Sequence, residues 1–86
     1  MPHCHSLKDK RAVIRPILDG ARRRYQVAAA EVGFQDKWQR ALLGMACVGG
    51  DGTYVHEMLT KVERFVWSFP EIEVLHVEQT AFPWGE

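Results

Sequence analysis

The sequence has no long hydrophobic run and very little cysteine, and these absences exclude several classes of protein. No segment approaches the roughly 20 consecutive apolar residues of a membrane-spanning helix, and the start lacks the charged-then-apolar pattern of a secretion signal. The two cysteines, Cys4 and Cys47, can form at most one disulfide bond. Cys47 stands in an apolar run, which favours a buried free thiol. We therefore expect a cytoplasmic protein without a membrane partner.

The chain also has a formal net charge of zero, although its charged residues are unevenly distributed along the sequence. The 86 residues carry 11 Lys and Arg against 11 Asp and Glu, and 47% are apolar. Residues 1–40 hold nine basic against four acidic side chains, whereas residues 41–86 hold two against seven. This asymmetry indicates either an anionic partner for one face, or two halves that attract each other within the fold or within an oligomer. Length and composition are typical of one globular domain.

Sequence motifs of catalysis and metal binding are missing as well. The chain has no glycine-rich loop followed by a lysine and a hydroxyl residue, and no nucleophile elbow. The terminal run His3–His5 offers too few donors for a site of four ligands. Asp51 within Gly49–Gly52 would repel an anion, so a loop with a helix cap explains these glycines better. His56 and His76 are isolated. We expect a non-enzymatic protein with no metal and no cofactor.

The first element that is present is a helix starting near Ser6. Ser6 and Asp9 have the spacing of a capping box, in which both side chains satisfy free backbone N–H groups. The one-sided apolar stripe that follows extends to Tyr25 and is typical of a helix packed on a sheet. Pro16 and Gly20 interrupt its interior, and a proline there predicts a kink or an irregular first turn.

Two strands, a second helix and a last strand follow. Residues 26–32 and 41–48 form a predicted hairpin whose second strand is largely buried. Residues 53–68 form an amphipathic helix whose apolar side chains fall within an arc of about 120°. Residues 72–79 place four apolar side chains, Ile72, Val74, Leu75 and Val77, among glutamates and predict a final strand.

The expected fold is therefore α+β, in the order helix, strand, strand, helix, strand. Both helices are expected on one face of the sheet, because each has a single apolar stripe. We expect one domain over residues 1–86, with residues 1–5 as an N-terminal remnant and residues 80–86 as a tail.

Several segments carry a resemblance to a known family. They are Ser6–Arg11, Ala30–Glu31, Gln35–Ala41 and Leu43–Ala46. In order and spacing they resemble the YlxP-like family, a bacterial family of unknown function, over essentially the whole chain. The resemblance implies a ferredoxin-like βαββαβ fold, and genes that often lie beside those for translation factors and a ribosome-binding factor. It implies no known activity.

The chain departs from that family at its start. Relatives carry a further segment, with a β-strand, before the residues that match His5–Leu7, and this first strand lies centrally, between the third and fourth strands. Its loss would expose two strand edges. Three hypotheses follow. The first is that the natural gene starts further upstream than Met1, which we favour. The second is that residues 41–48 and 72–79 pair directly, as parallel strands. The third is that two chains complete each other's sheets.

Basic side chains gather on the first predicted helix, where four of them fall within an arc of about 60°. Such a ridge predicts salt-sensitive contact with the phosphates of RNA. The alternative is an ordinary solvated flank, neutralised in part by Asp19 and suited to the helix dipole. The candidate nucleic-acid-binding residues are Lys8, Arg11, Arg15, Arg22, Arg23 and Arg24.

Two tryptophans are candidate protein-contact residues. Trp67 lies about 120° from the centre of the apolar stripe of its helix, so it either meets a partner or folds back on the domain. Trp84, in the tail, has the same two alternatives. The leading hypothesis is an RNA- or ribosome-associated factor, the second a protein-interaction or homo-oligomeric module, and the third a small-molecule enzyme. Gln35, Asp36 and Trp38 serve either function or the shape of the hairpin.

Overall fold

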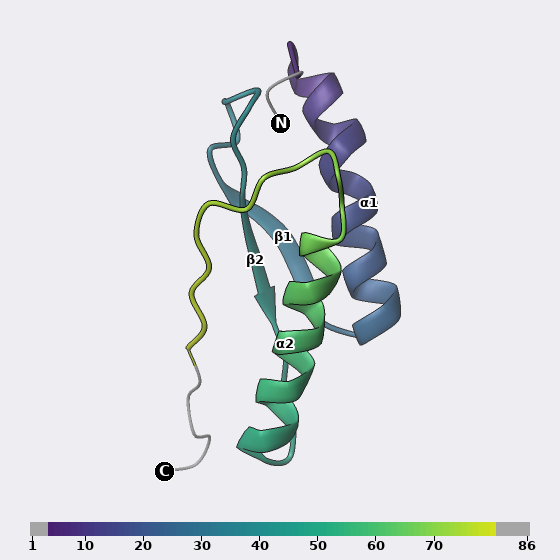
Figure 1. The fold of residues 1–86 in the computed structure, drawn as a ribbon, viewed down its shortest axis with the longest axis vertical. Coiled ribbons are helices and arrows are strands. Elements are labelled where there is room, and N and C mark those ends of the chain that lie inside the picture. The colour runs from purple at the N-terminus through teal and green to yellow at the C-terminus, as the bar shows by residue number, and fades with distance from the viewer. Residues whose placement is uncertain (1–3, 81–86) are drawn as a thin grey trace.

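A computed structural model describes residues 4–80 of the chain. In Figure 1 the helices lie beside a β-hairpin. The elements are α1 (Leu7–Tyr25), β1 (Ala28–Gly33), β2 (Leu42–Ala46) and α2 (Gly52–Trp67). The α+β class predicted from the sequence is therefore confirmed.

Helix α1 begins where its cap was predicted. The Ser6 hydroxyl oxygen accepts a hydrogen bond from the Asp9 backbone N–H at 3.1 Å, and the Asp9 carboxylate accepts one from the His5 N–H at 3.1 Å. The helix runs without a break from Leu7 to Tyr25 with Pro16 inside it. It ends at Gln26, whose backbone turns into the left-handed region at φ 54° and donates to the carbonyl of residue 22.

The hairpin is antiparallel, with Ala29 opposite Met45 and Glu31 opposite Leu43, and its register shifts between residues 31 and 33. The prediction that its second strand is largely buried was wrong: Leu42 is 51% exposed and the rest of β2 is at best half-buried. The reason is that β2 has a neighbouring strand on one side only among residues 4–80.

Both helices pack on the same face of the hairpin. Alternate residues of β1 differ in burial: Ala29 is buried, whereas Ala28 and Ala30 are exposed. The buried face meets the apolar stripes of α1 and α2, as the helical periodicity predicts. The core cluster consists of Ala21, Val27, Ala29 and Val62, with Leu18, Tyr25, Met45, Cys47, Met58 and Phe65 packed against it.

The predicted last strand is not formed. Residues 72–80 are extended, but the structure gives them no strand pairing with β2 or with any other described segment. A strand needs a partner as well as a β-prone sequence, and a groove separates this segment from the free edge of β2. Direct pairing of residues 41–48 with 72–79 is thus also absent.

Replacing Asp51 with alanine is expected to lower the free energy of unfolding by about 1 kcal/mol. The Asp51 carboxylate caps α2, because its Oδ1 accepts the Tyr54 N–H at 2.9 Å. Urea unfolding would measure the loss. Asp51→Asn retains the acceptor and should stay within a few tenths of a kcal/mol of the parent. Equal losses in both variants would contradict a role of the cap.

Candidate nucleic-acid and protein-interaction surfaces

Three basic side chains on α1 are fully available to solvent. Lys8, Arg11 and Arg15 are exposed, and none of them forms a hydrogen bond or ion pair with another residue in the range 4–80. Their spacing of three and four residues places them on one side of the helix. We call these three residues the α1 basic flank. It is the part of the predicted ridge that keeps its charges free for a ligand.

The other three basic residues of the predicted ridge are engaged within the protein. The Arg22 guanidinium donates to the Ala29 carbonyl at 3.1 Å and to the Asp19 carboxylate at 3.0 Å, which ties the end of α1 to β1. Arg23 donates to the Asp19 carbonyl at 3.4 Å. The Arg24 guanidinium lies 5.2 Å from the centre of an aromatic ring of α2, within cation–π distance.

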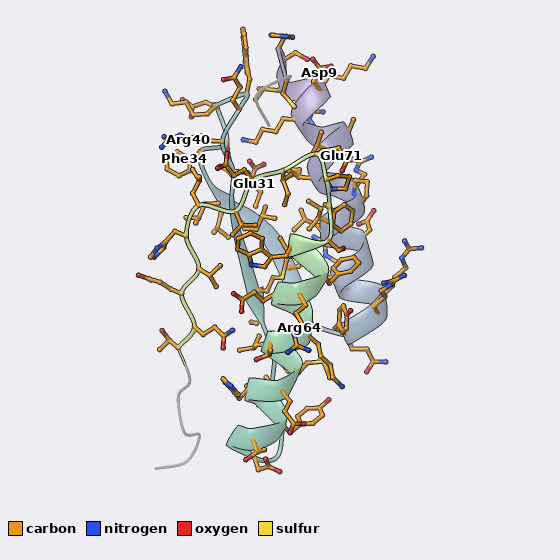
Figure 2. All side chains as sticks on the ribbon, in the orientation of Figure 1. Asp9, Glu31, Phe34, Arg40, Arg64 and Glu71 are labelled. Carbon is orange, nitrogen blue, oxygen red and sulfur yellow. The ribbon has the colours of Figure 1, made fainter. Side chains whose placement is uncertain are left out.

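The second lysine of the helix, Lys10, is buried, and sequence reasoning did not single it out. Only 1% of Lys10 is exposed. Its ammonium donates to the carbonyls of Phe34 at 2.6 Å and Lys37 at 2.8 Å, and pairs with the Glu31 carboxylate at 2.5 Å. In Figure 2, Glu31 and Phe34 lie at the end of the hairpin near the start of α1. Lys10 therefore fastens the hairpin loop to the helix.

The loop between the strands also holds itself in shape. The Lys37 N–H donates to the Phe34 carbonyl at 2.9 Å, and the Gln35 side chain donates to the Glu31 carbonyl at 3.2 Å. Gln35 thus shapes the hairpin. Trp38 is 51% exposed and contributes apolar surface at the loop.

A groove of about 560 Å³ lies beside β2. Its lining includes Ile17 of α1, Met45 of β2 and Val62 of α2, and residues 72–80 also line it. We call it the β2 groove. Trp67 is 56% exposed and lines the same groove, so it joins a surface that is open to solvent. Trp84, the other predicted contact residue, lies outside the described residues.

Histidine, cysteine and carboxylate side chains do not gather anywhere in residues 4–80 into a group of three or more that could hold a metal ion. Cys4 is buried, Cys47 is half-buried, and both are free thiols. His76 contacts only the exposed Glu78 carboxylate, at 3.2 Å. Neither helix of the described part is long and apolar enough to cross a membrane.

Comparison with known proteins places the chain in a family. Residues 1–79 match the family described as "Protein of unknown function (DUF503)". The chain is also similar to "Uncharacterized protein YlxP" of Bacillus subtilis (strain 168), with 43% identity over 68 residues, which cover 79% of this chain and 74% of the relative. No solved structure matches it. On both the family match and this identity, the chain belongs to the DUF503, or YlxP-like, family of proteins of unknown function.

Proposed function

We propose that the protein is a non-enzymatic binding protein whose α1 basic flank contacts the phosphate backbone of RNA. The observation that carries the proposal is the state of Lys8, Arg11 and Arg15: all three are exposed and have no partner within residues 4–80. A cation that already has an intramolecular partner must give it up to bind phosphate, whereas these three need not.

The spacing of the flank suits a nucleic-acid backbone. Lys8 and Arg15 are separated by about 10 Å along the helix axis, at about 1.5 Å per residue. In a DNA duplex each strand advances by about 3.4 Å per phosphate along the axis, and on that scale the flank spans about three phosphate steps. Contacts of this kind position a backbone without reading its sequence.

The overall neutrality of the chain bears on how tightly it would bind. The formal net charge is zero, so the attraction is local to α1 rather than spread over the molecule. We therefore expect the isolated protein to bind RNA weakly and in a salt-sensitive manner. Weak binding of this kind suits a protein that docks on a larger ribonucleoprotein. The ribosome is one such surface.

Replacing Arg11 and Arg15 with glutamate should lower the affinity for single-stranded polyuridylate by about tenfold or more at low salt. The plot of log K against log salt should flatten by about 1.4, since each lost phosphate contact removes about 0.7 from the slope on single strands. Filter binding over a salt series measures both quantities. Replacing Lys61 and Arg64 of α2 with glutamate makes the same charge change on the other helix and should leave both values near those of the parent.

Two results would contradict this proposal. One is the absence of salt-dependent retention of the parent chain on RNA. The other is an equal loss of affinity in the α1 and α2 double variants, which would show that only total charge matters. In either case the basic flank is a solvated helix face.

A protein-interaction function is the second candidate, and a separate observation favours it. Trp67 and the β2 groove combine exposed apolar surface with an unpaired strand edge, and exposed aromatic side chains are enriched at binding hot spots. That a partner binds there by strand addition is argued next. The absence of enzymatic activity stays a prediction.

A further inference from the structure

The outer edge of β2 is unpaired in the described part of the chain. β1 pairs with β2 from Ala28 opposite Ala46 to Gly33 opposite Leu42, and the sheet contains only these two strands within residues 4–80. The N–H and C=O groups on the other edge of β2 therefore have no ladder partner. Such an edge is a template for pairing with another strand.

The floor beside this edge is apolar. Ile14 and Ile17 of α1 and Val62 of α2 line the β2 groove but are at most 4% exposed in the single chain, whereas Val66 is half-buried and Leu42 and Trp67, which also line it, are 51% and 56% exposed. A strand added to β2 would lie over these side chains, with alternate residues directed toward them. The groove thus offers both main-chain hydrogen bonds and an apolar floor, the two elements of recognition by strand addition.

The same chain contains a β-prone segment without a partner. Residues 72–79 contain four β-prone apolar residues, of which Ile72 and Val74 are half-buried, while Leu75 is 73% and Val77 43% exposed. In Figure 1 this segment descends beside β2 after leaving α2. Within residues 4–80 it forms the turn bond from the Ile72 N–H to the Phe69 carbonyl and a bond from the Gln79 side chain to the Glu63 carboxylate. It is thus held by few polar contacts.

We propose that two copies of the chain exchange their 72–79 segments, so that each segment pairs with the outer edge of β2 in the other copy. This exchange would pair the free edge of β2 with a strand and would cover the apolar side chains that each groove leaves exposed, such as Leu42 and Trp67. It closes by two-fold symmetry, because each copy gives one segment and receives one. This assembly does not depend on the RNA-binding proposal, which concerns the opposite flank of α1.

Exchange has an advantage over pairing within one chain. Within a chain, β2 and residues 72–79 are joined through α2, and this crossover makes the two segments parallel. A second copy is free of that connection and can present its segment antiparallel, which is the more stable pairing per residue. The turn at Phe69–Ile72, which contains Pro70, is the hinge.

Charge also favours two copies. The chain has zero net charge, so identical copies do not repel each other overall. The exchanged segment belongs to the acidic half, with Glu73 and Glu78, whereas the hairpin loop next to β2 carries Lys37 and Arg40. Each copy therefore brings acidic side chains to the basic half of the other.

Light scattering on a size-exclusion column, over a range of concentrations of the full chain, tests the proposal. The parent should form a dimer with a dissociation constant in the micromolar range. Replacing Leu75 and Val77 with proline removes two N–H donors from the exchanged strand and should weaken dimerisation by about tenfold or more. Both positions are exposed and unpaired in the single chain, so its helical circular dichroism should not change.

Leu75→Thr is the matched control. Threonine keeps the backbone N–H donor and, as a β-branched residue, favours a strand, so dimerisation should stay close to that of the parent. Hydrogen exchange adds an independent reading: the amides of residues 72–79 should become protected as the concentration rises. A parent chain that stays monomeric at every concentration, a dimer unaffected by the two prolines, or a dimer with unprotected 72–79 amides would each overturn the proposal.

Discussion

Replacing Lys10 with alanine is expected to destabilise the fold by about 3 kcal/mol, at the low end of the range for removing one member of a buried ion pair. The Lys10 side chain is 2% exposed and that of Glu31 is 19% exposed, so a mostly buried carboxylate loses its counter-ion. The carbonyls of Phe34 and Lys37 lose their donor at the same time. Urea unfolding followed by circular dichroism would measure the change.

Two further variants separate this effect from a general loss of charge. Lys8→Ala removes an exposed lysine from the same helix and should change the stability by no more than about 0.5 kcal/mol. Combining Lys10→Met with Glu31→Leu replaces the pair by apolar groups and should recover part of the loss, because no buried charge is left over. Similar losses for Lys8→Ala and Lys10→Ala would contradict the assignment.

The buried lysine also changes how the charge distribution is interpreted. Residues 1–40 carry nine basic side chains, but the charge of Lys10 is neutralised inside the protein and Arg22 and Arg24 contact other elements. Several of the basic side chains that suggested an anionic ligand therefore hold α1 against the hairpin and α2 instead. The polar partners of Lys10 and Arg22 all lie within residues 1–40, so these contacts are not an attraction between the two halves of the chain, and an external anionic partner stays a prediction.

Local sequence signals predicted the helices well. The caps at Ser6 and Asp51 form the hydrogen bonds that their spacing predicts, because a cap depends on residues within one turn. The apolar stripe of α2 likewise faces the core, with Val62 buried at 3% exposure. These features need no knowledge of distant segments.

Features that depend on distant segments were predicted poorly. Lys10 lies seven residues before Ile17, so both residues occupy the same side of α1. Because Ile17 belongs to the apolar stripe, the sequence could have indicated that Lys10 is buried. Its partners are more than 20 residues away, at Glu31 and in the hairpin loop, and no local pattern identifies them. The strand predicted at residues 72–79 failed for the same reason, because its apolar, partly β-branched composition indicates β-propensity but not whether a partner edge is within reach.

The candidate sites show the same division. Helical spacing placed Lys8, Arg11 and Arg15 correctly on one exposed side of α1, since that depends only on the geometry of the helix. It could not show that Arg22 turns to the carbonyl of Ala29, which is on another element. The β2 groove was beyond sequence reasoning as a cavity, although the free strand edge beside it was anticipated.

Gly20 interrupts the helical pattern of α1 for a reason that lies in α2. It is buried, and a β-carbon built on it would overlap Cζ of Phe65 and lie 3.1 Å from Cε2 of the same ring. The ring has little freedom to withdraw: it meets Tyr25 and Phe69 edge to face, at 5.6 and 5.1 Å between ring centres, and Arg24 covers it. Glycine is therefore required for the close contact of the two helices.

Replacing Gly20 with valine is accordingly expected to cost about 2 kcal/mol, within the range for overpacking a core. For a domain of this size that corresponds to a fall in melting temperature of about 8–16 °C. Gly20→Ala gains up to about 1 kcal/mol of helix propensity, yet should still be less stable than the parent because the β-carbon alone reaches the ring. Differential scanning calorimetry would measure both variants.

Two further variants, one at Phe65 and one at a glycine far from it, test whether the contact between Gly20 and Phe65 causes the loss of stability. Adding Phe65→Leu to Gly20→Ala shortens the side chain that the new methyl meets, so the double variant should be more stable than the sum of the two single changes predicts. Gly52→Ala, at the start of α2, places a methyl group where nothing lies within 4 Å, and its effect should stay within about 0.5 kcal/mol. Additive effects of the changes at Gly20 and Phe65 would contradict this assignment. The contact between the two residues would then not be what excludes larger side chains from position 20. The packing of α1 against α2 would have to depend on other parts of their apolar stripes.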